Sequence, residues 1–272
     1  MASKAKAAGT AVAVARAKVN LPAHLQAGGD DVVAFQQRLS APSGNKISVT
    51  QDKKFSMPPT DAFPAGVKMD TIHGVIVDFI AKKNWYEGAF NRDNIVPPNC
   101  FALDFVPHDA LLPSENSPDI QGEACKTCEM NQWNPVAPGS TKKKKACQDK
   151  YVLALLAPDA AEGAPLITLE LSATAINAFD KYVRDLANDY GLAPYAFVTE
   201  FSFDPNSEWA SVRCGNPAPV DKALYELAKS KREEAVTVLR VEPQTSEFEE
   251  KVVAARLPAP KTRAAGKPAA KR

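Results

Sequence analysis

Histidine is scarce in this chain of 272 residues, which contains only His24, His73 and His108. Acid–base and triad chemistry most often uses histidine, so the chain has little material for either. The sequence also lacks a P-loop and a G-x-G-x-x-G motif, the glycine-rich patterns that hold nucleotide phosphates. Its carboxylates are scattered, and Asp78, which follows an apolar run, has no partner pattern. We therefore expect a protein that is not an enzyme.

Long apolar runs are missing too, since none approaches the ~20 residues that a membrane-spanning helix needs. The alanine-rich start, MASKAKAAGTAVAVARAK, has only a short apolar stretch that Arg16 interrupts, which argues against a signal peptide. We expect an intracellular protein without a membrane partner. In a reducing compartment, clustered cysteines are more often metal ligands than disulfides.

The net charge of +1 conceals an uneven distribution. Residues 1–20 contribute +4 and residues 257–272 contribute +5, so the remaining residues carry −8. We expect flexible basic segments at both ends, over residues 1–40 and 243–272. An acidic body is not an obvious nucleic-acid binder, so any such surface would have to be a local basic strip.

Cysteine is concentrated in one stretch. Four of the five cysteines lie between residues 100 and 147, with the spacing C-x24-C-x2-C-x18-C. A C-x-x-C pair and two distant thiols can surround one tetrahedral ion, with each sulfur about 2.3 Å from it. We predict a structural zinc site with Cys100, Cys125, Cys128 and Cys147 as ligands, because four thiolates leave no position for a catalytic water. His108 is an alternative to Cys100, and buried thiols without a metal are the competing interpretation.

The residue pattern predicts a mainly β, α+β domain over residues 41–242, with an insertion at about 97–149. The clearest helix runs from Ser172 to Tyr190, where apolar residues recur at three- and four-residue spacing. A second helix is expected at about 220–230, and residues 235–243 either continue it or form a last strand. Strands are expected over 46–58, 72–80, 151–158, 164–172 and 195–203, with Gly74 marking a bulge or bend.

Two clusters mix cations with aromatic rings, which is the composition that a single-stranded nucleic acid needs for its phosphates and bases. The first cluster consists of Lys82, Lys83, Trp85, Tyr86, Phe90 and Arg92. The second consists of Trp133, Lys142, Lys143, Lys144 and Lys145. The competing interpretation places the aromatic rings in the core and the cations on a solvated rim.

Several blocks, in their order along the chain, resemble a group of phage single-stranded DNA-binding proteins. The blocks are VIVDFIAKKNWYEGAF, PPNCFALD, CKTCEMNQW, KKKKAC and LSATAINAFDKYVRDL, and the resemblance covers about residues 45–205. It implies an oligonucleotide-binding (OB) barrel with a cysteine-rich insertion, similar in plan to the zinc-bearing barrel of the eukaryotic replication protein A large subunit. Five strands with one helix between later strands fit that plan.

The resemblance implies single-stranded DNA binding without strong sequence preference, in phage replication or recombination, inside the host cytoplasm. The aromatic residues of both clusters would stack on bases, the cations would hold phosphates, and zinc would shape the loop. Replication or recombination proteins are further candidate partners. The alternative is a zinc-stabilised structural or protein-interaction module that binds no nucleic acid. A metal-dependent nuclease would need a carboxylate cluster that the sequence does not display.

Overall fold

The computed structural model describes residues 45–58, 66–88, 96–135, 141 and 143–243. The chain divides into two units, residues 1–40 and 41–272, and every described residue belongs to the second. The predicted N-terminal segment 1–40 and nearly all of the predicted tail 243–272 lie outside the described residues.

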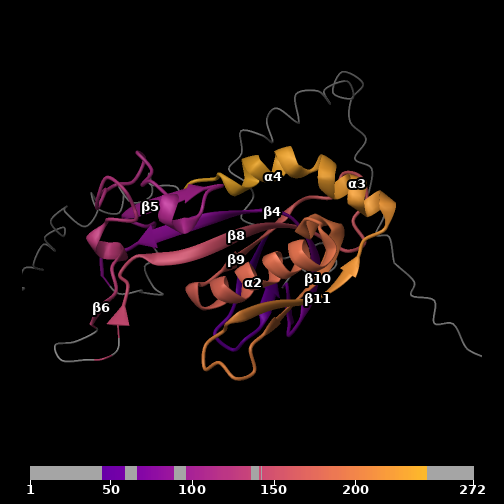
Figure 1. Cartoon of the computed structure of the whole chain (residues 1–272), viewed down its shortest axis with the longest axis horizontal. Coiled ribbons are helices and arrows are strands. Elements are labelled where there is room, and N and C mark those ends of the chain that lie inside the picture. The colour runs from indigo at the N-terminus through magenta and orange to yellow at the C-terminus, as the bar shows by residue number, and fades with distance from the viewer. Residues whose placement is uncertain (1–44, 59–65, 89–95, 136–140, 142, 244–272) are drawn as a thin grey trace, which may run out of the picture. The chain divides into compact units, whose positions relative to one another are not determined.

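The second unit is built on a mixed, nine-stranded sheet with the order β11-β10-β4-β8-β9-β1-β2-β3, in which β5 also pairs with β4 (Figure 1). All of its pairings are antiparallel except that of β1 with β9. The strands are β1 Lys46–Val49, β2 Phe55–Met57, β3 Val67–Met69, β4 Ile72–Trp85, β5 Cys100–Asp104, β8 Gln148–Leu156, β9 Ile167–Leu171, β10 Phe197–Phe203 and β11 Val212–Pro219.

The sheet curls into a half-barrel. Phe55 of β2 and Phe203 of β10 stack with their ring centroids 4.4 Å apart, although β2 and β10 are far apart in the strand order. The contact draws the two ends of the sheet toward each other. The structure therefore confirms the mainly β, α+β class.

Strand β4 pairs with three other strands of the sheet. It is buried on both faces, as its β-branched composition predicts. Its first residues pair with β10 and its last with β5, while β8 pairs along the opposite edge. The register shifts between Ile76 and Asp78, so the bulge falls after Gly74 rather than at it. A Cβ at Gly74 would lie 3.4 Å from the carbonyl oxygen of Leu156, which is an ordinary van der Waals contact.

Helices cover the two faces of the sheet in separate cores. Helix α2 (Ala173–Tyr190) buries Ala175, Phe179, Tyr182 and Leu186 against one face. Helices α3 (Lys222–Ser230) and α4 (Arg232–Leu239) pack on the opposite face of β4 and β8, in orange and yellow above the sheet in Figure 1. None of the helices in the described part of the chain is both long and apolar enough to cross a membrane.

The predicted helix 172–190 is confirmed almost to the residue. Ser172 stands at the N-cap, where its hydroxyl is hydrogen-bonded to that of Thr174 at 2.9 Å. Gly191 ends the helix with a φ of 66°, and its N–H donates to the carbonyl of Ala187. Glycine adopts this left-handed conformation without the steric cost that a Cβ brings, which is why it commonly follows helix ends.

Two local expectations need correction or completion. Residues 46–58 form a hairpin of β1 and β2 rather than one strand, because the chain turns at Thr50–Lys54 and Lys53 has a φ of 54°. Residues 235–243 begin inside α4 rather than in a strand. Ala235 and Leu239 lie four residues apart on one helix face, and burial of that face outweighs the β preference of the neighbouring valines.

The sheet ends at β11, which pairs only with β10 among the described strands. This edge strand contains Pro217 and Pro219, neither of which has a backbone N–H to donate. Directly before Pro217, Asn216 has a φ of 46°. The edge is thus interrupted at three positions in its second half.

Candidate metal centre and nucleic-acid interface

The four clustered cysteines reach the same place from three directions. Cys100 begins β5 and lies opposite Trp85 of β4. Cys125 and Cys128 bracket a turn in which the carbonyl of Ala124 accepts from the N–H groups of Thr127 and Cys128, at 3.2 and 3.1 Å. Cys147 immediately precedes β8, and its N–H donates to the carbonyl of Met130 at 2.8 Å.

All four cysteines line one small cavity of about 20 Å³. Lys83, Trp85, Gly122 and Asn131 are among the other residues that line it. Gly122 lies directly beside the pair, since a Cβ at Gly122 would be 3.4 Å from Cys128 Cβ. Cysteines that are separated by 24, 2 and 18 residues in the sequence therefore line the same cavity.

The donor set fits a soft metal ion. As the side chains stand, no three His, Cys, Asp or Glu residues of the described chain are gathered closely enough to hold an ion. Nevertheless, the four thiols line one cavity. Cysteine thiolates select zinc and similar soft ions over calcium or magnesium. Residues Cys100, Cys125, Cys128 and Cys147 would hold it, and its contribution would be structural.

Two of the thiols in this cavity, those of Cys125 and Cys147, are neutral at physiological pH. Burial raises the pKa of Cys125 to about 11 and that of Cys147 to about 12, although the nearby Lys83 ammonium opposes the rise. A bound ion must therefore displace protons from the sulfurs, and metal affinity will depend on pH.

His108 does not join the cavity. Its Nε2 atom is 2.8 Å from the carbonyl oxygen of Lys150, and its ring packs edge-on to Tyr151 at 4.5 Å between centroids. Burial lowers the pKa of His108, so the neutral imidazole is favoured. These contacts give His108 a place in the fold that needs no metal.

Beside the cysteines lies a polar network formed by Lys83, Asn131, Lys145 and Asp149. The ammonium of Lys83, a residue only 1% exposed, donates to Asp149 and, at 3.0 Å, to Asn131 Oδ1. Lys145 Nζ donates to the other oxygen of Asp149 at 2.8 Å and to Asn131 Oδ1 at 3.2 Å. Asn131 in turn donates to the carbonyl of Cys125 at 2.7 Å, which ties the network to the cysteine turn.

The opposite face of β4 carries a different ion cluster. Glu170 lies among three lysines, with Lys150 Nζ at 2.5 Å, Lys82 Nζ at 3.5 Å and Lys46 Nζ at 3.6 Å. Burial would raise the pKa of Glu170, but these three ammonium groups outweigh it and lower the pKa to about 2. Burial lowers the pKa of Lys82, while Glu170 acts against that shift.

The first predicted nucleic-acid cluster is thus divided between two faces, because successive strand residues alternate. Lys83 and Trp85 line the cysteine cavity, and Trp85 is partly buried. Lys82 belongs to the Glu170 cluster, and Tyr86, also partly buried, accepts from Asn84 Nδ2 at 3.3 Å. Phe90 and Arg92 lie outside the described residues.

The second predicted cluster gathers on a small β-ribbon. Strands β6 (Asn134–Pro135) and β7 (Lys143–Lys144) pair antiparallel, and Figure 1 shows β6 at the end of the cysteine-rich segment, away from the helices. Trp133 at the base of the ribbon is 62% exposed, and Lys145 Nζ lies 5.4 Å from its ring centroid. Lys143 and Lys144 are exposed, whereas Lys142 lies outside the described residues.

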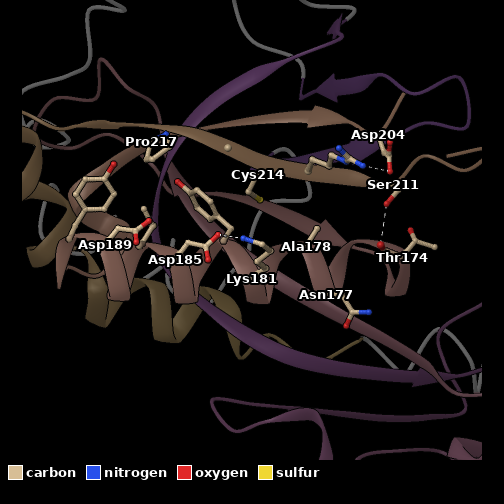
Figure 2. A pocket seen from close by; sticks show the side chains of 15 residues that line it. Thr174, Asn177, Ala178, Lys181, Asp185, Asp189, Asp204, Ser211, Cys214 and Pro217 are labelled. Atoms are coloured by element: carbon tan, nitrogen blue, oxygen red, sulfur yellow. Dashed lines mark hydrogen bonds and ion pairs between the residues drawn. The ribbon is translucent and has the colours of Figure 1, made fainter. Parts of the chain in front are cut away.

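A much larger cavity, of about 660 Å³, lies elsewhere, between α2 and β11 (Figure 2). Its charged side chains are largely paired with one another: Lys181 with Asp185 at 2.5 Å, and Arg213 with Asp204 at 2.6 Å. Cys214 lies in its wall, and burial raises the pKa of this thiol to about 12. Internal pairing leaves little net charge here for a polyanion, so size alone does not make this cavity the nucleic-acid site.

Several residues around these sites were missed by the sequence reasoning. Asp149 and Asn131 bind Lys83 and Lys145, and Glu170 binds Lys82, Lys150 and Lys46, yet these three partners come from separate elements. Only the alternation of β4 could have indicated that Lys82 and Lys83 need different partners. Trp209, 70% exposed in the turn between β10 and β11, had no distinguishing sequence signal.

No protein-family model, curated protein or solved structure matches this chain.

Proposed function

We propose that the chain binds single-stranded DNA without strong sequence preference, in phage replication or recombination, and that it is not an enzyme. One observation carries the proposal: Trp133 is 62% exposed beside Lys143, Lys144 and Lys145. A large exposed ring is costly to leave in water, and stacking on bases contributes ~1–3 kcal/mol per base. The lysines would bind the adjoining phosphates.

The fold is compatible with this proposal. A curled, mainly antiparallel sheet with a helix between later strands supports an OB-like barrel as the scaffold. Zinc held by Cys100, Cys125, Cys128 and Cys147 would fix the segment from which the ribbon projects. Tyr86 and Lys82 would contribute on the other face of β4, while the partly buried Trp85 would contribute less than Trp133.

The test is a titration of a fluorescent 30-nucleotide oligo-dT at low and moderate salt. We expect tight binding that weakens steeply as salt rises, because lysine–phosphate contacts release counterions. Trp133→Ala should weaken binding by ~1–3 kcal/mol, or roughly 5- to 150-fold. Trp209→Ala is the matched control, since Trp209 is at least as exposed but lies in another loop.

Two results would refute the assignment. Absence of binding at low salt, with zinc confirmed in the protein, would remove the DNA-binding function altogether. Equal losses for the Trp133 and Trp209 variants would show that the ribbon is not the contact surface.

A second candidate function rests on the exposed apolar side chains of the same cysteine-rich segment. Leu112 is 65% exposed and Ile120 is 48% exposed, which favours a zinc-stabilised module that docks on a protein. Tryptophan fluorescence separates the two functions: DNA should protect Trp133 from iodide quenching only if the chain binds it.

A further inference from the structure

Lys83 is buried in a way that calls for an explanation. Lysine is almost never fully buried unless it is paired, and Lys83 is only 1% exposed in the middle of β4–β8 pairing. Its ammonium has two partners, the Asp149 carboxylate and the neutral Asn131 carboxamide.

The charges in this network do not balance. Asp149 is shared, because its second oxygen binds Lys145 at 2.8 Å. Two ammonium groups thus face one carboxylate, and Asn131 contributes no charge. Asp149 is 18% exposed and Lys145 is 19% exposed, so one positive charge is left over in a site largely withdrawn from water. An unbalanced buried charge is costly unless an anion offsets it.

The neighbouring cavity can supply that anion. Lys83 lines it together with all four clustered cysteines, and its charge acts on Cys125 and Cys147. When four thiols bind Zn²⁺ they release four protons, and the resulting centre, with one dication and four thiolates, carries −2.

We propose that Lys83 is a positioning residue that electrostatically stabilises an anionic four-cysteine metal centre. This inference rests on the zinc part of the proposed function. A DNA phosphate is a poorer candidate for the balancing anion, because the side chain of Lys83 is only 2% exposed. Lys145 is the more accessible of the two and also contacts Trp133, so it is the lysine suited to face outward.

Two substitutions of opposite charge test the proposal in the full-length protein. Lys83→Gln removes a positive charge beside the cavity, and Asp149→Asn removes a negative charge. Zinc content is measured on purified protein, and zinc retention by competition with a chromogenic chelator at fixed pH. We expect Lys83→Gln to lose its zinc at a chelator concentration that is ~10-fold or more below the concentration that wild type requires. Substitutions of residues that support metal ligands without binding the metal weaken metal affinity by a similar factor. Asp149→Asn should retain zinc as well as or better than wild type.

A purely structural role predicts a different pattern. If the network only supported the fold, both substitutions would weaken zinc retention alike, and that result would overturn the proposal. Retention within threefold of wild type in Lys83→Gln would also overturn it. Lys83→Met, which keeps the long stem, covers the case in which the glutamine variant does not fold. If neither folds, weakened retention in Asp149→Asn is the overturning result. A wild-type protein that contains no zinc would instead refute the zinc part of the proposed function.

Discussion

Lys82 and Lys83 are adjacent in the sequence, yet their ammonium groups bind carboxylates on opposite faces of β4. Lys82 lies 3.5 Å from Glu170, and Lys83 binds Asp149 beside the cysteine cavity. One face therefore carries a cluster that supports the sheet, and the other carries the candidate metal centre. Substitutions at neighbouring positions should have unrelated effects.

The first prediction concerns Trp85, which is partly buried and lines the cysteine cavity. Trp85→Ala removes a large apolar contact, so we expect the free energy of unfolding to fall by ~1–3 kcal/mol in urea denaturation. Trp209→Ala serves as the control and should stay within ~0.5 kcal/mol of wild type, since Trp209 is 70% exposed. Equal stability of all three proteins would show that Trp85 does not support the cavity.

The second prediction concerns acid stability. The pKa of Glu170 is held at about 2 in the folded protein, below its ordinary value of 4.5, by Lys82, Lys150 and Lys46 against the effect of burial. A lowered carboxyl pKa stabilises the fold fully above the ordinary value, and this contribution is lost as pH falls from about 4.5 to about 2. The contribution near neutrality is on the order of 3 kcal/mol at most.

Glu170→Gln should therefore destabilise the protein at pH 7 and flatten its stability profile between pH 4.5 and pH 2, measured by urea denaturation. Glu234→Gln is the control, because Glu234 is 44% exposed and its bond to Lys231 is a surface pair worth ~0–1 kcal/mol. If the free energy of unfolding of the Glu170 variant fell between pH 4.5 and pH 2 as steeply as that of wild type, the prediction would be contradicted.

The third prediction concerns removal of the metal. In its described residues, the segment between β5 and β8 has only short 3₁₀ turns (His108–Ala110 and Glu129–Asn131) and the two-residue strands of the ribbon. Because no long helix or strand supports this described part, a chelator should raise its amide hydrogen exchange selectively. Strands β4 and β8 should keep their protection, because the core that they share with α3 and α4 contains no cysteine. If a chelator left amide hydrogen exchange within 111–147 unaltered, that result would argue against a metal ion that stabilises this segment.

The fourth prediction concerns the end of α2. Gly191 has a φ of 66°, and a Cβ there would meet no atom within 4 Å. Gly191→Ala should therefore cost about 1 kcal/mol through backbone strain alone, measured by thermal unfolding. Gly215→Ala is matched to it, since that position is equally open but lacks a positive φ, and its stability should not fall. Similar losses in the two variants would mean that strain at Gly191 is not the cause.

Local patterns predicted the elements whose periodicity is strong. The apolar stripe of residues 172–190 became α2, and the continuous β-branched run in 72–80 became the central part of β4. Strand β11 could not be predicted, because VRCGNPAP contains two prolines and no alternation. It is a strand because β10 pairs with it, which is a tertiary cause that composition does not record.

At the candidate site, too, sequence patterns predicted some features and strand pairing decided the others. Cysteine spacing indicated which four residues would come together, and they line one cavity. Which lysines face that cavity depends on strand register, and their partners Asp149 and Glu170 depend on the pairing of β4 with β8 and of β8 with β9. Register is a property of the assembled sheet, so residue type alone could not separate Lys82 from Lys83.

The interrupted edge of β11 has a consequence for crowding. A protein that accumulates at high local concentration risks joining copies through open strand edges, which leads to strand exchange and aggregation. Pro217 and Pro219 offer no N–H to an incoming strand, and Asn216, with its φ of 46°, lies directly before Pro217 where the register with β10 shifts. Copies of this chain that meet at the β11 edge would therefore contact each other through side chains, which can separate again, rather than through a shared sheet.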